Sequence, residues 1–131
     1  MLMFTNLPDI VWHGAGGQLV DPIPSEDGEF GAELILKSMR ADKSFVAVDF
    51  PDEIADNVKL RHSCVIEDVN QIIPLFTDTY EIGAVVAVGK TIQEAVDKCK
   101  EYAEQVEGLG VEYDTASLDD TADQLVEALK L

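Results

Sequence analysis

Basic residues are scarce in this chain of 131 residues, which has 9 Lys and Arg against 26 Asp and Glu and a formal net charge of −17. Proteins hold nucleic acids largely by placing Lys and Arg on phosphates, and anionic membrane surfaces attract clusters of the same residues. A chain this negative would be repelled by both. We therefore predict neither a nucleic-acid partner nor a membrane partner, and we interpret most of the carboxylates as a solvated surface.

Metal-ligating residues and long apolar runs are also few. Neither His13 nor His62 has a cysteine or carboxylate at a spacing typical of zinc ligands. Cys64 and Cys99 are too few for a disulfide framework and fall at apolar positions, which fits a reducing cytoplasm. No run approaches the length of a membrane span, and the first residues lack the pattern of a signal peptide. We predict no metal, no cofactor of its own and a cytoplasmic location.

A cluster of five acidic residues near the C-terminus could in principle bind calcium or magnesium, because these ions prefer oxygen ligands. The group lacks the order of an EF-hand, with no central glycine and no closing Glu. Carboxylates in a first helical turn are explained by the helix dipole alone. We therefore interpret the group as a solvated helix start, formed by Glu112, Asp114, Asp119, Asp120 and Asp123.

Apolar alternation in the first two thirds of the chain indicates strands. The predicted strands are 31–39, 45–49, 63–67, 71–76 and 82–88, the third and fourth of which form a hairpin. Pro74 cannot donate to a ladder, so the second arm of the hairpin should end there or lie at an edge. Residues 50–57 predict a turn or a single helical turn.

Two amphipathic helices follow the strands. Thr91 and Glu94 form a capping box, and apolar residues then recur at helical spacing until Gly108 stops the helix. Ser117 and Asp120 give a second capping signal, before an apolar face of Leu118, Ala122, Leu125, Val126 and Leu129. Since strands come first and helices last, we predict an α+β fold, with a small mixed or antiparallel sheet and both C-terminal helices packed on it.

The first 30 residues differ from the rest. Residues 6–12 predict a short helix with Pro8 in its first turn, ended by Gly14, Gly16 and Gly17. A Pro-rich polar loop follows over 20–29. We expect an N-terminal helix and loop at 1–30 and one α+β domain at 31–131.

The strand–turn–helix segment at 81–106 carries a motif in Val86, Val88, Gly89, Thr91, Glu94 and Ala95. It resembles the C-terminal subdomain of ATP-grasp carboxylate–amine ligases, in particular phosphoribosylamine–glycine ligases, in which a strand of the type a-V-x-a-x-G runs into T-x-x-E-A at a helix start. Residues 7–14 resemble the stretch that follows the ATP-grasp core, and residues 31–39 resemble the first strand of the subdomain. The resemblance covers 31–108.

This resemblance implies a lobe that completes a ligand cleft and packs on a separate ATP-grasp catalytic domain. The family's magnesium-binding carboxylates and Asn, its lysines and its Gly-rich phosphate loop lie upstream of the matched part. The chain has no Walker-type loop and no Glu-x-Asn-x-Arg run, and its glycines at 14–17 follow a predicted helix rather than a strand. We therefore predict no catalytic residue and no ATP turnover by the chain alone.

The few cations support a second hypothesis, a module that binds or sequesters an anionic small molecule such as a nucleotide. Arg40 and Lys43 follow the first predicted strand, and Arg61 and His62 precede the hairpin. Neighbouring strand ends would gather these side chains into a positive pocket for a phosphate or carboxylate, to which Lys90 would add. The alternative is that they only offset nearby Asp and Glu.

Assembly gives a third hypothesis, in which the chain is a structural or interaction protein. For the binding module of the second hypothesis, a homo-oligomer would also let cations from two chains meet in one pocket. An exposed sheet edge near Pro74 or one helix face would hold such a protein in its assembly. The residues leave these hypotheses open.

Overall fold

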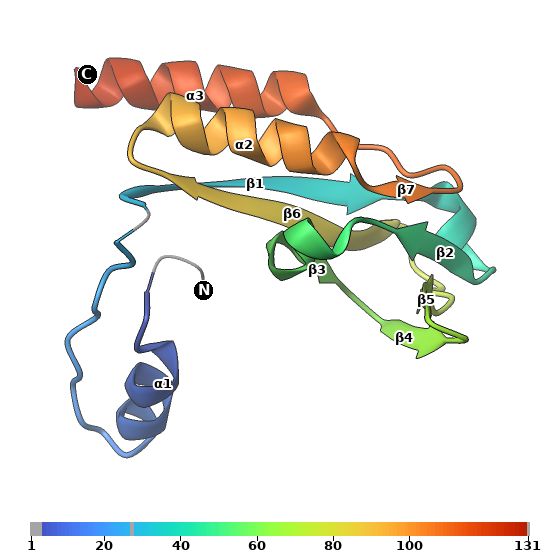
Figure 1. Cartoon of the computed structure of the whole chain (residues 1–131), viewed down its shortest axis with the longest axis horizontal. Helices are drawn as coiled ribbons and strands as arrows, with labels where there is room; N and C mark the ends of the chain where they lie inside the picture. Colours follow the sequence, from blue (N-terminus) through green and yellow to red (C-terminus); the bar gives the residue numbers. More distant parts are fainter. Residues whose placement is uncertain (1–3, 27, 131) are drawn as a thin grey trace.

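The computed structural model describes residues 4–26 and 28–130 and shows an α+β fold with two antiparallel sheets (Figure 1). The first sheet has the strand order β1 (Phe30–Lys37), β6 (Glu81–Gly89), β3 (Val58–Leu60). The second has the order β4 (Ser63–Ile66), β5 (Val69–Ile72), β2 (Val46–Asp49), β7 (Glu107–Gly108). The predicted α+β class is confirmed, although the strands divide into two sheets.

Two long helices cover one face of the first sheet (Figure 1). The helix α2 (Ile92–Glu104) packs across β1 and β6, and α3 (Thr115–Leu129) lies along α2 and reaches β1. Short 3₁₀ helices, η1 (Met39–Asp42) and η2 (Asp52–Asn57), connect strands. The N-terminal helix α1 (Leu7–Ala15) stands apart from both sheets in Figure 1.

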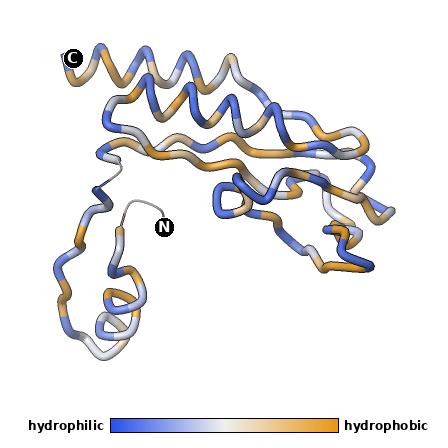
Figure 2. Tube along the Cα trace, in the orientation of Figure 1, coloured by the Kyte–Doolittle hydropathy of each residue, from blue (hydrophilic) through white to orange (hydrophobic). Residues whose placement is uncertain are grey.

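The core lies between the first sheet and α2. Leu36 and Val85 on the strands and Cys99 on α2 are completely buried, and the Cys99 thiol donates to the carbonyl of Val85 at 3.3 Å. The second sheet adds Val48 and Ile72, also completely buried. Hydrophobic residues are nearly continuous along β6 in Figure 2, and β6 is the central strand of its sheet, with most of its residues buried.

The predicted start of α2 is confirmed, but its predicted end is wrong. The Thr91 hydroxyl accepts from the amide of Glu94 at 3.1 Å, as the capping box requires. The helix ends at Glu104, and Gly108 belongs to β7. The backbone leaves the helix early because Glu107 and Gly108 pair with β2, which helical residues cannot do.

The N-terminal cap of α3 also differs from the prediction. The carboxylate of Asp114 accepts from the amide of Ser117 at 3.1 Å, so Asp114 is the cap and Ser117 already lies in the first turn. On the predicted apolar face Leu118 and Ala122 are half-buried. Leu129, toward the end of the helix, is 50% exposed.

Several strand limits need correction. Met39 lies in η1 rather than in the first strand, which ends at Lys37. The hairpin is confirmed, but its turn is Glu67–Asp68, both with positive φ, so β5 begins at Val69 and ends before Pro74. The strand β3 was not predicted, because three residues give too short a pattern.

The N-terminal helix is longer than predicted. It runs to Ala15 and includes Gly14, while Gly16 and Gly17 follow it. Of the predicted 1–30 unit, residues 1–3 and 27 lie outside the described residues, as does residue 131 of the predicted domain.

Candidate functional site

Four of the five predicted ligand-binding cations lie near one end of the first sheet. Arg40 lies in η1, which follows β1, and Lys43 comes directly after η1, whereas Arg61 and His62 come directly after β3. The fifth, Lys90, lies beyond the opposite end of β6, a strand of nine residues that spans roughly 26 Å. The structure therefore does not bring Lys90 to the other four.

Those four cations are divided by an intervening segment. The carbonyl of His62 accepts from the amide of Ile73 at 2.7 Å, and the carbonyl of Asp42 accepts from the amide of Phe76 at 2.9 Å. Arg61 forms an ion pair with Glu81 at 3.1 Å, and Lys43 approaches Asp42 at 4.0 Å. A common ligand for Arg40, Lys43, Arg61 and His62 stays a prediction.

Unusual backbone conformations occur near the same end of the sheet. His62, Phe76 and Tyr80 have φ values of 47°, 52° and 53°, in the left-handed region that side chains rarely adopt. The carbonyl of Tyr80 accepts from the amide of the buried Ser38, which holds this loop against the end of β1. Sequence reasoning missed this feature, since Phe and Tyr give no signal for a positive φ and a single His gives only a weak one.

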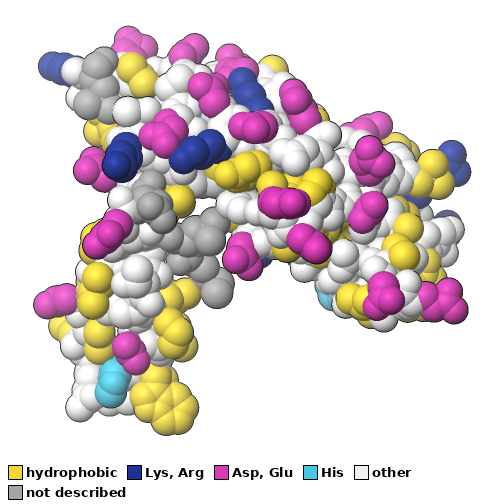
Figure 3. Space-filling model, viewed as in Figure 1, with side chains coloured by type: hydrophobic (Ala, Val, Ile, Leu, Met, Phe, Trp, Pro, Cys, Tyr) yellow, Lys and Arg dark blue, Asp and Glu magenta, His cyan; other side chains and the backbone are white. Residues whose placement is uncertain are grey.

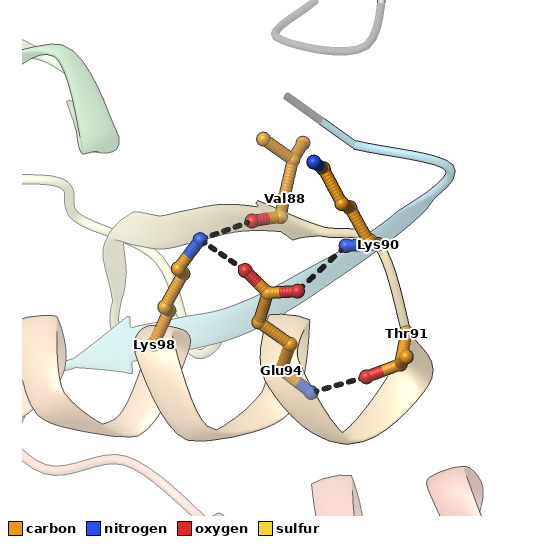
Figure 4. Close-up of polar contacts among 5 residues, drawn as sticks. All are labelled: Val88, Lys90, Thr91, Glu94 and Lys98. Atoms are coloured by element: carbon orange, nitrogen blue, oxygen red, sulfur yellow. Dashed lines mark hydrogen bonds and ion pairs between the residues drawn. The ribbon is translucent and has the colours of Figure 1, made fainter. Parts of the chain in front are cut away.

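The turn that carries the resemblance is built around one carboxylate (Figure 4). Glu94 accepts from the amide of Lys90 at 2.9 Å and from the ammonium of Lys98 at 2.7 Å. These two hydrogen bonds, the one from Lys98 first, lower the pKa of Glu94 below its ordinary value. Lys98 also lies 3.5 Å from the carbonyl of Val88, so it ties the end of β6 to α2.

A small groove opens beside this turn. Its volume is about 330 Å³, and its lining includes Asn57, Lys90, Lys98 and Tyr102. Gly89 allows the strand to cross closely over the helix, because a Cβ there would lie 2.6 Å from the amide nitrogen of Ala95. The groove is thus lined by two lysines, one amide and the carboxylate of Glu94, which already pairs with Lys98.

A larger groove of about 620 Å³ lies between the outer edge of β1 and the helices α2 and α3. Leu118, Ala122 and Leu125 of α3 form much of its apolar wall. Sequence reasoning missed it, because the apolar face of α3 predicted a helix packed closely on the sheet. The structure instead leaves Leu125 41% exposed.

The segment 4–26, which we call the arm, folds on itself and buries little. Asn6 holds it closed: its side chain donates to the carbonyl of Asp21 and accepts from the amide of Ile23, both at 2.8 Å. The helix α1 within it has no buried residue, and Trp12 is 79% exposed. Figure 3 shows hydrophobic side chains spread over this part of the surface.

Cys99, Asp114 and Asp119 are held in the fold by burial, helix capping and ion pairing. Burial, above all, raises the pKa of the Cys99 thiol to about 11, which makes it a poor nucleophile. Asp114 caps α3, and Asp119 pairs with Lys100.

Among residues 4–26 and 28–130, no group of three His, Cys, Asp or Glu side chains is placed to hold a metal ion. None of the helices in this part of the chain has the length and apolar composition needed to cross a bilayer.

No family model matches this sequence, and a search of curated proteins finds no match either. The resemblance to the ATP-grasp subdomain therefore stays a prediction from the sequence motif at 86–95.

Proposed function

We propose that this chain is a non-catalytic lobe of the ATP-grasp C-terminal type, which packs on a separate catalytic domain and completes a ligand cleft there. The observation that supports this most directly is the arm. Its backbone is held in a defined shape, yet Trp12 and Leu19 lie almost wholly in water. Trp12 lies in α1 and Leu19 in the loop that follows it, and large apolar side chains that together form an exposed patch are typical of an interaction surface.

The energy available from the arm is of the same order as the cost of association. Full burial of one large apolar side chain contributes about 1.5–3 kcal/mol. Covering Val11, Trp12 and Leu19 would thus contribute about 5–9 kcal/mol, whereas association costs about 4–15 kcal/mol before any contact is made. The arm would therefore anchor a larger interface that includes part of the α+β domain.

The position of the arm explains how docking would complete a cleft. The arm leads into β1 at Phe30, and Phe30 pairs with Gly89. Gly89 directly precedes Lys90, which lines the smaller groove. A catalytic domain that covered the arm would stand beside this groove, where the two lysines would meet an anionic substrate group bound by that domain.

A reconstitution experiment tests this function. The chain is mixed with a purified ATP-grasp catalytic core that lacks its own C-terminal subdomain, and complex formation and Mg·ATP-dependent ligation are measured. We expect a 1:1 complex that Trp12→Ala weakens, while Val65→Ala, a matched change at a side chain 66% exposed on the hairpin, does not. Steady ADP release by the pure chain, or equal binding by both variants, would reject the proposal.

We also propose a second candidate, a module that captures an anionic small molecule by itself. The smaller groove supports it, because Lys90 and Lys98 line the same space with Asn57, and only one of the two lysines is paired there with Glu94. Thermal-shift measurements with ATP, ADP and ribose 5-phosphate test it: one ligand should raise the melting temperature, and Lys90→Ala should remove that shift. Arg61→Ala tests the predicted cation group at the other end of the sheet: loss of the thermal shift in this variant, and not in Lys90→Ala, would place the ligand there. No shift with any of the three ligands counts against this candidate.

A further inference from the structure

We propose that the larger groove binds an extended basic segment of a partner protein, which adds a strand to the free edge of β1. This inference goes beyond the proposed lobe function, since it uses neither the arm nor the groove beside Lys90. Addition of a strand to an open sheet edge is an established mode of peptide recognition, in which the backbone gives affinity and alternate side chains give specificity.

The free edge follows from the hydrogen bonds at the end of β1. The amide of Ser38 bonds to Tyr80 on the β6 side, while the amide and carbonyl of Lys37 bond to Glu112 on the outer side. Because backbone groups alternate along a strand, those of residues 31, 33 and 35 also point outward. Within residues 4–26 and 28–130, no other strand pairs with this edge.

The groove beside the edge suits alternating side chains. Leu34 faces the helices and is buried, whereas Glu33 faces the other side of the sheet and is exposed. An added strand would likewise place every second side chain beneath α3, against Leu118, Ala122 and Leu125. These positions call for apolar residues. The intervening side chains would lie on the same face as Glu33.

The charges around the groove indicate that the bound segment should be basic. The residues that line the groove include three acidic ones, Glu33, Glu112 and Asp114, and a single basic one, Lys37. A Lys or Arg opposite Glu33 would form a favourable cross-strand pair. The net charge of −17 would also speed the approach of a basic segment.

A second copy of the chain fits this edge poorly. The free stretch runs from residue 30 to 36, because Lys37 is already paired with Glu112, and its central residue is Glu33. A two-fold antiparallel pairing of two such edges would place Glu33 directly opposite its counterpart. Like charges in that position destabilise a ladder, and two chains of charge −17 repel each other. The observations therefore favour a foreign strand.

The test uses a synthetic peptide, acetyl-Val-Lys-Val-Lys-Val-Lys-Val-amide, and the full chain labelled with ¹⁵N. We expect saturable shifts of the amide signals of Gly31, Glu33 and Ile35. The same peptide N-methylated at alternate residues keeps its charge but cannot form the ladder, and it should bind at least about tenfold more weakly. Equal binding of both peptides would show charge attraction alone and overturn the proposal.

Protein variants locate the site. Glu33→Lys should prefer the corresponding Val-Glu peptide, whereas Glu53→Lys, an equal charge change on the exposed surface of η2, should leave the preference unchanged. Ala122→Trp should block the groove, with an unchanged circular dichroism spectrum showing that it still folds. The proposal is overturned by an absence of shifts at millimolar peptide or by shifts confined to other elements. Shifts of the β1 signals that depend on protein concentration without peptide would also overturn it and would indicate self-pairing.

Discussion

Gly83 is the position at which a single methyl group should damage the fold most. It lies in β6, paired with Leu36 of β1 on one side and with Leu60 of β3 on the other. A Cβ built there would lie 2.3 Å from the carbonyl oxygen of Lys59 and 3.0 Å from the Cα of Leu60. Both are backbone atoms, so no side chain can rotate away to make room.

The size of the effect follows from the required movement. Ordinary contacts of a Cβ begin near 3.4 Å, so β3 would have to move by about 1 Å in Gly83→Ala. Overpacking of this kind costs about 1–3 kcal/mol. The shift also strains the hydrogen bond from the amide of Arg61 to Ile82, and each such bond contributes about 0.5–1.5 kcal/mol. We expect a total loss of about 2–4 kcal/mol.

Urea unfolding followed by circular dichroism measures this loss. With a slope of about 1.5 kcal/mol per molar urea, the midpoint of Gly83→Ala should fall by about 2 M. Gly14→Ala is the matched control, because a Cβ there meets nothing within 4 Å and α1 has no buried residue. It should leave the main transition in place and strengthen α1 locally by about 1 kcal/mol. A Gly83→Ala midpoint within about 0.2 M of the wild type would refute the close strand approach.

Three further predictions concern caps, thiols and pH. Asp114→Ala should cost about 1 kcal/mol of stability because the cap of α3 is lost, while Ser117→Ala should be nearly neutral; similar urea midpoints for the two variants would contradict this assignment. A disulfide reagent at about pH 8 should modify Cys64 quickly and Cys99 only after unfolding, since burial raises the pKa of Cys99 to about 11; rapid modification of both thiols in the native protein would be the contrary result. The pKa of Glu94 is lowered in the folded state, so folding favours its ionised form. Its contribution is full above its ordinary pKa of 4.5 and is lost as the pH falls through the folded-state pKa. The stability difference between wild type and Glu94→Gln should therefore shrink on acidification below about pH 4.5, and a difference that stays constant down to about pH 3 would exclude this coupling.

Local signals in the sequence predicted the elements that depend on local physics. The capping box at Thr91 identified the start of α2, and the turn residues between two apolar runs identified the hairpin. The predicted ends of helices and strands were wrong where the backbone pairs with a segment far away in the sequence. Gly108 pairs with Val48 instead of ending a helix, and Lys37 pairs with Glu112 across more than seventy residues of sequence.

The candidate sites were less predictable than the fold. The sequence indicated Arg40, Lys43, Arg61, His62 and Lys90 by their rarity, but it carries no information on which strand ends meet. The antiparallel register sets Lys90 at the far end of β6 from Arg61 and places it with Lys98 and Asn57 instead. The groove along β1 depends on how far α3 stands from the sheet, which side-chain pattern alone does not specify.

The sequence by itself determined the acidic surface, the α+β class and the capped turn at 89–94, because charge, hydrophobic period and capping act over a few residues. Only the tertiary structure decided that the strands form two sheets, that one edge of β1 stays open and that the arm remains uncovered. These features are set by hydrogen bonds and contacts between segments far apart in the chain, and many different pairings satisfy the same local pattern.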